Sequence, residues 1–231
     1  MKYVDLIIFD LDGTLVDSRE DIANAVNHTL RKVGLKEKSL SEITSYIGTG
    51  MRDLIRKSLG EECGLFDKSL SIFEDYYRRH CAECSVLYQG VKEILEHFKD
   101  KRKAIVTNRN YKFALLILKA LGIYDYFQDI IGGDDIGCMK PSYCPLDSLM
   151  QRFNIDREKT IIVGDMHIDI LAGKRAGIIT CAVTYGIGRK EDIVKAKPDY
   201  IIDNNGTIEE TKRQVEELWE NIDKVKIDNT E

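Results

Sequence analysis

The chain has 231 residues, with 34 Lys plus Arg against 39 Asp plus Glu, and its formal net charge is −5. This length is enough for a sizeable core and for one or two domains of roughly 100–200 residues each. A hydrophobic fraction of 43% and a charged fraction of 32% indicate a globular rather than a disordered chain. The negative charge excludes a general attraction to nucleic acid or to an anionic membrane surface. No apolar run approaches the roughly 20 residues that span a bilayer.

The cysteines and the first residues predict the cellular compartment. Six cysteines are too few for a disulfide scaffold, and the segment 1–6 lacks the longer apolar stretch of a signal peptide. We therefore expect a cytoplasmic protein whose thiols are free. Cys81 and Cys84 have C-x-x-C spacing, but no second pair or suitably spaced histidines accompany them, so incidental thiols are expected rather than zinc ligands.

Short apolar segments, several of them rich in β-branched residues, predict the buried strands of a parallel sheet. In chain order they cover residues 4–9, 103–106, 129–131, 160–163, 178–183 and 200–202. Helical patterns lie between them at residues 91–99, 111–121, 144–153 and 168–176. This alternation predicts an α/β fold with a doubly wound, mainly parallel sheet and a Rossmann-like core.

One long interval breaks the alternation of strands and helices. From residue 17 to residue 87 no buried strand is evident, and apolar residues recur at helical spacing, as in Ile22, Val26 and Leu30. We predict a core formed by residues 1–16 and 88–231, and a helical domain inserted at residues 17–87. The expected hinges are residues 16–18 and 87–90. A further helix is predicted within residues 207–231.

Polar residues of the types that enzymes use in catalysis follow the predicted strands. Ligands of doubly wound folds bind beyond the carboxyl ends of the strands, so these residues are expected to meet at one edge of the sheet. They are Asp10, Asp12, Thr107, Asn108, Lys140, Asp165 and Asp169.

Each of these residues has a simpler structural explanation when it is taken alone. An aspartate or threonine after a strand is often a helix N-cap, and a single lysine such as Lys140 is most simply explained as a surface residue. Taken together, however, at least three carboxylates would repel one another unless a cation or a positive side chain lies among them. Carboxylate oxygens suit Mg²⁺, which also binds water and substrate phosphate.

These residue types fit phosphoryl transfer. A carboxylate such as that of Asp10 can attack phosphorus and form an aspartyl-phosphate, and a second carboxylate, that of Asp12, can act as acid and then as base. Thr107 and Lys140 can bind and neutralise the phosphoryl oxygens. Asp165 can hold the metal, and Asp169 can orient Lys140 or the metal-bound water.

Four segments resemble the four motifs of the haloacid dehalogenase-like hydrolase superfamily, and they occur in the same order. They are Asp10-Leu11-Asp12-Gly13-Thr14-Leu15-Val16-Asp17-Ser18, Val106-Thr107-Asn108, Lys140-Pro141 and Gly164-Asp165-x-x-x-Asp169. The similarity extends from Val4 to about Asp203, and the nearest branch is the phosphoglycolate phosphatase-like one with a helical cap.

The resemblance implies a role for each matching residue. Asp10 is implied as nucleophile and metal ligand. Asp12 is implied as general acid and base, and as a metal ligand through its backbone carbonyl. Thr107, with Asn108 beside it, is implied to bind the phosphoryl group. Lys140 is implied to stabilise the phosphoaspartate, Asp165 to bind Mg²⁺, and Asp169 to support the site.

Two positions depart from the usual family pattern. Met166 stands where a small serine is common, and Ser142-Tyr143-Cys144 follows Lys140-Pro141 where a second proline is common. Neither departure removes a catalytic group. The acid at Asp12 favours phosphate-ester or anhydride chemistry over the dehalogenase and carbon–phosphorus cleavage branches of the superfamily.

The segment from Gly48 to Arg52 in the inserted domain is the candidate for substrate selection. Its glycines permit close approach of the backbone to a ligand, and Arg52 can pair with a substrate carboxylate or a second phosphate. The alternative, a simple helix–helix turn with a solvated arginine, is equally open.

The expected function is that of a Mg²⁺-dependent phosphatase of a small phosphorylated metabolite, acting through an aspartyl-phosphate. Phosphoglycolate, pyrophosphate, a sugar phosphate and a nucleoside monophosphate all remain as substrates. The alternatives are a phosphomutase of the β-phosphoglucomutase type and a non-catalytic phosphometabolite-binding module. No nucleic-acid or membrane partner is expected, and the protein is either a monomer or a homodimer.

Overall fold

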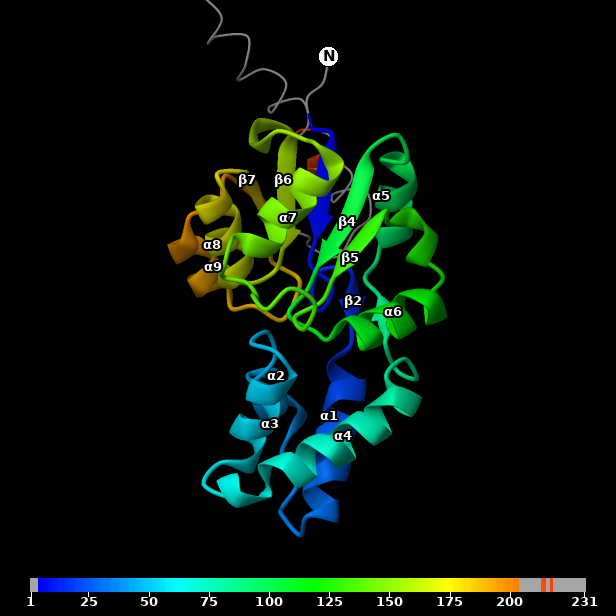
Figure 1. The fold of residues 1–231 in the computed structure, drawn as a ribbon, viewed down its shortest axis with the longest axis vertical. Coiled ribbons are helices and arrows are strands. Elements are labelled where there is room, and N and C mark those ends of the chain that lie inside the picture. The colour runs from blue at the N-terminus through cyan, green and yellow to red at the C-terminus, as the bar shows by residue number, and fades with distance from the viewer. Residues whose placement is uncertain (1–3, 204–212, 215–216, 218–231) are drawn as a thin grey trace, which may run out of the picture.

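A single parallel sheet forms the core of the protein (Figure 1). The computed structural model describes residues 4–203, 213, 214 and 217. Six strands lie in the order β5-β4-β1-β6-β7-β8, and every neighbouring pair is parallel. They are β1 Leu6–Phe9, β4 Arg102–Val106, β5 Asp129–Ile131, β6 Thr160–Gly164, β7 Ile179–Val183 and β8 Tyr200–Ile202. The predicted α/β fold is confirmed, whereas the helix predicted within residues 207–231 falls almost entirely outside the described residues.

Helices cover both faces of the sheet, as the apolar character of the strands requires. Alternate residues of β1 serve opposite faces, with Ile7 and Phe9 in one buried cluster and Leu6 and Ile8 in another. The first cluster includes residues of α5 (Val91–His97) and α6 (Tyr111–Ala120), and the second includes residues of α7 (Cys144–Phe153) and α8 (His167–Ala176). A further short helix, α9 (Lys190–Ala196), packs against α8.

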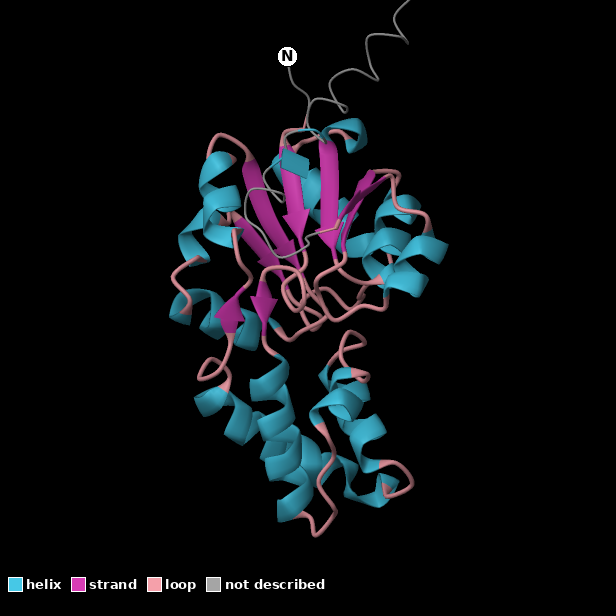
Figure 2. Cartoon of the chain, turned by 180° about the vertical axis from the view of Figure 1, so that it is seen from behind, coloured by secondary structure: helices cyan, strands magenta, loops and turns pink. Residues whose placement is uncertain are grey.

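Four helices lie between residues 17 and 86 of the chain. They are α1 (Arg19–Lys32), α2 (Leu40–Thr44), α3 (Met51–Leu59) and α4 (Phe66–His80). Short 3-10 turns lie at Cys63–Leu65, Tyr124–Tyr126 and Arg157–Lys159. α1 packs along α4 (Figures 1 and 2). Apolar side chains of both helices, among them Val26 and Phe73, are buried. We call the segment from α1 to α4 the helical insert.

A two-stranded link joins the helical insert to the sheet. β2 (Val16–Asp17) leaves the core, β3 (Val86–Leu87) returns to it, and the two strands pair antiparallel. The insert lies beyond the carboxyl ends of the sheet strands (Figure 1). This arrangement places the insert over the loops that carry the predicted site.

The structure corrects one expectation about the cysteines. Cys138 and Cys144 form a disulfide, so the prediction of free thiols is wrong for this pair. Cys138 lies in the loop that carries Lys140 and Cys144 is the first residue of α7, and the turn between them brings together two side chains that are six residues apart. Among the described side chains, Cys81, Cys84 and Cys181 are free. None of the described helices is long and apolar enough to cross a membrane.

Candidate active site

The predicted site residues come from the carboxyl ends of neighbouring strands. Asp10 follows β1, Thr107 follows β4 and Asp165 follows β6, and these three strands are adjacent in the sheet. Lys140 arrives from the loop between β5 and α7. All four side chains are buried although three of them are charged types, which is unusual unless they are paired or serve a function.

Lys140 joins two of the carboxylates. Its Nζ lies 2.8 Å from Oδ1 of Asp10 and 2.6 Å from Oδ1 of Asp169. Burial alone lowers the pKa of Lys140, but the adjacent carboxylates outweigh burial and raise it, so the lysine remains a cation. Asp169 is fixed at the start of α8, where its Oδ2 accepts a hydrogen bond of 2.9 Å from the backbone N–H of Met166.

Asp165 is held by three donors from two other segments. Thr14 donates through Oγ1 at 3.0 Å, and the backbone N–H groups of Ile187 and Gly188 donate at 2.7 and 3.1 Å. Gly13 packs so closely that a Cβ there would lie 2.1 Å from Oδ2 of Asp165. Both oxygens of the carboxylate are therefore held by hydrogen bonds, and Gly13 packs against it.

Asp10, Asp165 and Asp169 form a cluster of carboxylates. One oxygen from each of them lies within 4.8 Å of the others. Burial raises the pKa of Asp10 to about 8 and that of Asp165 to about 7, and the charge of Asp169 adds to both shifts. One lysine cannot neutralise three ionised acids, so a further cation would balance the remaining charge of the cluster. Such oxygen ligands suit a hard divalent metal.

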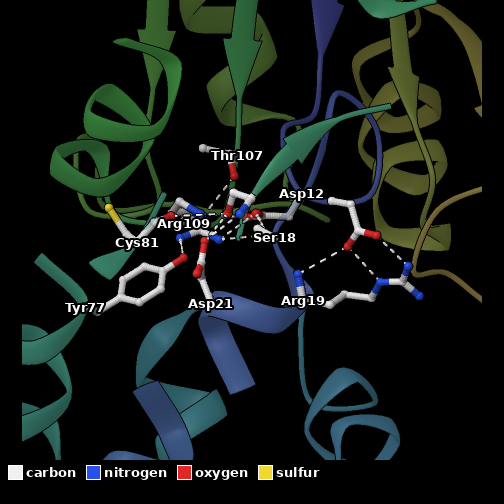
Figure 3. Close-up of polar contacts among 10 residues, drawn as sticks. Asp12, Ser18, Arg19, Asp21, Tyr77, Cys81, Thr107 and Arg109 are labelled. Atoms are coloured by element: carbon white, nitrogen blue, oxygen red, sulfur yellow. Dashed lines mark hydrogen bonds and ion pairs between the residues drawn. The ribbon is translucent and has the colours of Figure 1, made fainter. Parts of the chain in front are cut away.

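Asp12 points to a different partner. Arg109, two residues after Thr107, donates from Nε to Oδ2 of Asp12 at 2.8 Å and from Nη2 to Oδ1 at 2.5 Å. The Oγ of Ser18 donates to the same carboxylate, and the guanidinium also donates to the hydroxyl of Tyr77 from α4 (Figure 3). The carboxylate of Asp12 thus lies outside the cluster in this structure.

Asn108 connects the helical insert to the catalytic loops. Its Nδ2 donates to the carbonyl of Gly48 at 2.8 Å and to the carbonyl of Lys140 at 2.9 Å, while its Oδ1 accepts from the N–H of Lys140 at 2.9 Å. A Cβ on Gly48 would lie 2.5 Å from Sδ of Met166, so the backbone of the insert approaches the site closely there.

Arg52 does not reach this site. Its side chain is exposed and its guanidinium lies over the ring of Phe66, 4.8 Å from the centroid. The segment from Gly48 to Arg52 therefore contributes its backbone and Met51 to the site, but not its arginine.

A cleft of about 600 Å³, solvent at its mouth included, lies between the sheet edge and the insert. Asp10, Asp12, Thr107, Asn108, Arg109 and Lys140 line its core side. The insert adds mostly apolar side chains, such as Ile22, Leu54 and Phe73, together with the ring of Tyr77. A small ligand with a strongly polar end suits these walls.

The sequence prediction missed Arg109 and Tyr77. Arg109 follows the Thr107-Asn108 pair directly, so its place at a strand end was a usable signal. Tyr77 carried no signal beyond the helical spacing of its segment, because only the packing of α4 over the core brings its hydroxyl to the site.

Comparison with known proteins identifies the family. The family model described as haloacid dehalogenase-like hydrolase matches residues 7–183, which is more than half of the chain. The chain belongs to the haloacid dehalogenase-like hydrolases.

Relatives place the chain within this family. It is 36% identical over 218 residues to the phosphoglycolate phosphatase of Vibrio cholerae, covering 90% of this chain and 96% of the relative. It is also 36% identical over 216 residues to the phosphoglycolate phosphatase of Aquifex aeolicus, covering 86% of this chain and 99% of the relative. The chain is thus a haloacid dehalogenase-like hydrolase of the phosphoglycolate phosphatase-like branch, and its enzyme class is that of the phosphoric monoester hydrolases.

A solved structure supports the same placement. A crystal structure described as a predicted phosphoglycolate phosphatase from Haemophilus somnus matches with a TM-score of 0.83 at 33% identity. The match covers 87% of this chain and 94% of that chain. The chain is therefore a phosphatase for a small phosphorylated substrate, built on the fold of its relatives.

Proposed function

We propose that this enzyme is a Mg²⁺-dependent phosphatase for phosphoglycolate or a closely similar small phosphomonoester. The observation that supports it best is the convergence of Asp10, Thr107 and Lys140 on one cleft beside a cluster of three buried carboxylates. Pyrophosphate is the second candidate substrate. The names of the relatives favour the phosphomonoester, and they favour hydrolysis over both a phosphomutase and a binding module.

In the proposed reaction, Asp10 attacks the phosphorus atom and forms an aspartyl-phosphate. The bond from phosphorus to the ester oxygen breaks, and Asp12 gives its proton to that oxygen as the alcohol leaves. Asp12 then takes a proton from water, which attacks the phosphorus of the intermediate and releases inorganic phosphate. Thr107 and Lys140 bind the phosphoryl oxygens through both steps, where developing charge is greatest.

The carboxylates fit Mg²⁺ as a resident ion. Asp10 and Asp165 would supply side-chain oxygens and Asp12 its backbone carbonyl, and Asp169 would hold Lys140 in place. When bound, the ion would neutralise phosphoryl charge and help to orient the phosphoryl group for attack.

We also propose that residues 17–87 act as a cap that closes over bound substrate and excludes water, with residues 16–18 and 87–90 as hinges. The contact between Asn108 and the backbone of Gly48 supports a closed form. Protease cleavage at the two hinges would be slowed by Mg²⁺ plus a phosphate analogue if the cap closes. Unchanged cleavage would contradict this.

The cytoplasmic location and the choice between monomer and homodimer stay predictions.

The decisive test of function is phosphate release from a panel of small phosphorylated compounds, with and without Mg²⁺. The panel includes phosphoglycolate, pyrophosphate, hexose phosphates and a nucleoside monophosphate. We expect Mg²⁺-dependent release that is greatest with phosphoglycolate and abolished in Asp10→Asn. Conversion of glucose 1-phosphate to an isomer without free phosphate would instead indicate a mutase.

A further inference from the structure

Arg109 is a buried cation on the wall of the catalytic cleft. Its side chain is 7% exposed, and it comes from the core rather than from the helical insert. Among the residues that line this cleft in the described part of the chain, Arg109 and Lys140 are the cations. Lys140 lies beside Asp10 and is assigned above to the phosphoryl group, so Arg109 is the cation that can bind a second group of the ligand.

The guanidinium already binds a carboxylate. Its Nε and Nη2 donate to the two oxygens of Asp12, which is the bidentate geometry in which arginine recognises carboxylates. The third side of the guanidinium is fixed by the hydroxyl of Tyr77, whose ring centroid lies 5.2 Å from Cζ of Arg109. The Nε and Nη2 donors of Arg109, which we call the fork, are therefore preorganised. Asp12 marks the position that a carboxylate takes on this fork (Figure 3).

Asp12 cannot keep this position during the proposed reaction. To transfer a proton to the ester oxygen it must turn from Arg109 and Ser18 toward the substrate. That movement would leave a buried guanidinium without its anion, which is costly. A substrate that carries its own anionic group near the ester oxygen can replace Asp12 on the fork, whereas a neutral substrate cannot.

We infer that Arg109 recognises a carboxylate of the substrate and is the specificity-determining residue of this site. The substrate class is a small phosphorylated hydroxy acid, with the phosphoryl group at Asp10 and the carboxylate at Arg109. The inference rests on the phosphatase function proposed above, and it assigns to Arg109 the task that the sequence had suggested for Arg52.

The test compares phosphoglycolate with its amide, which has nearly the same shape but lacks the carboxylate charge. The native enzyme should show kcat/KM about 100-fold higher for the acid, as expected for a charge-assisted bidentate contact. Arg109→Gln should bring the two values close together, and Arg109→Lys should restore part of the difference, because lysine keeps the charge without the fork. Arg56→Gln, an exposed arginine of the insert, is the matched control and should leave the ratio unchanged.

Each outcome decides the question. Similar kcat/KM values for acid and amide in the native enzyme would overturn the inference and leave the phosphatase intact. An equal fall for both substrates in Arg109→Gln would mean that Arg109 only positions Asp12, and would also overturn it. If Arg109→Gln fails to fold, Arg109→Lys takes its place: an acid-to-amide ratio equal to that of the native enzyme would overturn the inference, and a clearly smaller ratio would support it.

Binding separates this inference from the proposed function. In Asp10→Asn, calorimetry should show tighter binding of phosphoglycolate than of its amide, and the added Arg109→Gln change should remove the difference. Absence of turnover in the native enzyme, together with preferential binding of the acid, would refute the phosphatase but support Arg109 as the carboxylate receptor. Equal binding of acid and amide would refute the role of Arg109.

Discussion

Removing the positive charge of Lys140 should destabilise the protein strongly. We consider Lys140→Met, which keeps an unbranched side chain of similar length. Lys140 is 1% exposed and pairs with Asp10 and Asp169, so the change leaves buried carboxylates without their cation. Breaking a buried pair by removing one partner costs about 3–5 kcal/mol. We expect the upper part of that range, because Asp165 lies in the same cluster.

The loss should depend on pH and on metal. Urea unfolding followed by circular dichroism gives the free energy of unfolding for native and variant protein. At mildly acidic pH the carboxyl groups of Asp10 and Asp165 carry protons, because burial raises the pKa of Asp10 to about 8 and that of Asp165 to about 7. The loss should therefore be smaller there than above about pH 8. Added Mg²⁺ should restore part of the stability, since it supplies the missing positive charge. Phosphate release should fall about 100- to 1,000-fold.

Lys103 provides a matched control in the core. It is also buried, but its Nζ donates to the backbone carbonyls of Phe98 and Lys101 at 2.5 and 3.1 Å. Lys103→Met should therefore cost about 1–3 kcal/mol, with no recovery from Mg²⁺. Equal losses in the two variants, or a Lys140→Met loss that ignores both pH and Mg²⁺, would refute the argument that Lys140 acts by neutralising the cluster.

Three other predictions concern the same site. Burial raises the pKa of Asp10 to about 8 and that of Asp165 to about 7, above the roughly 3.9 of an unfolded aspartate. Between these pH values the metal-free folded state therefore binds more protons than the unfolded state. Urea midpoints should therefore fall as pH rises from about 4 to about 8, and Mg²⁺ should suppress this fall; a rise would contradict it. Gly13→Ala places a methyl group against Asp165 at a positive φ of 86°, and phosphate-release assays should show a loss of at least about 100-fold. Asn108→Ala removes the link to the carbonyl of Gly48 and should raise KM roughly tenfold in steady-state assays, whereas an unchanged KM would show that this contact does not support closure.

The strands were predictable because each is a short apolar run that ends at a polar residue. β1 ends before Asp10 and β4 before Thr107, as the residue pattern indicates. The meeting of these residues with Asp165 follows from parallel pairing alone, since it aligns the carboxyl ends of neighbouring strands. Their positions, though not their roles, are therefore consequences of the hydrophobic pattern.

Other features depend on packing that a linear pattern does not contain. α9 escaped prediction because it is short and polar, with Ile193 as its buried residue. Arg52 and Arg109 are equally suitable by type, and only the packing of α3 and α4 decides that one lies on Phe66 while the other faces the cleft. The disulfide likewise depends on the path of the Lys140 loop, which residue spacing does not determine.

The pairing of β2 with β3 allows the helical insert to be exchanged as one unit during evolution. The chain leaves the core at Val16 and returns to it at the paired residue Leu87, so the segment between them, which we call the cassette, can be replaced without moving either end. Five of the six sheet strands are encoded after that cassette and one before it, and none lies within it. A different helical unit can therefore be inserted there without altering the register of the sheet strands or the position of Asp10. The mostly apolar wall that the insert gives the cleft can thus change while Asp10, Lys140 and Arg109 of the core keep their places.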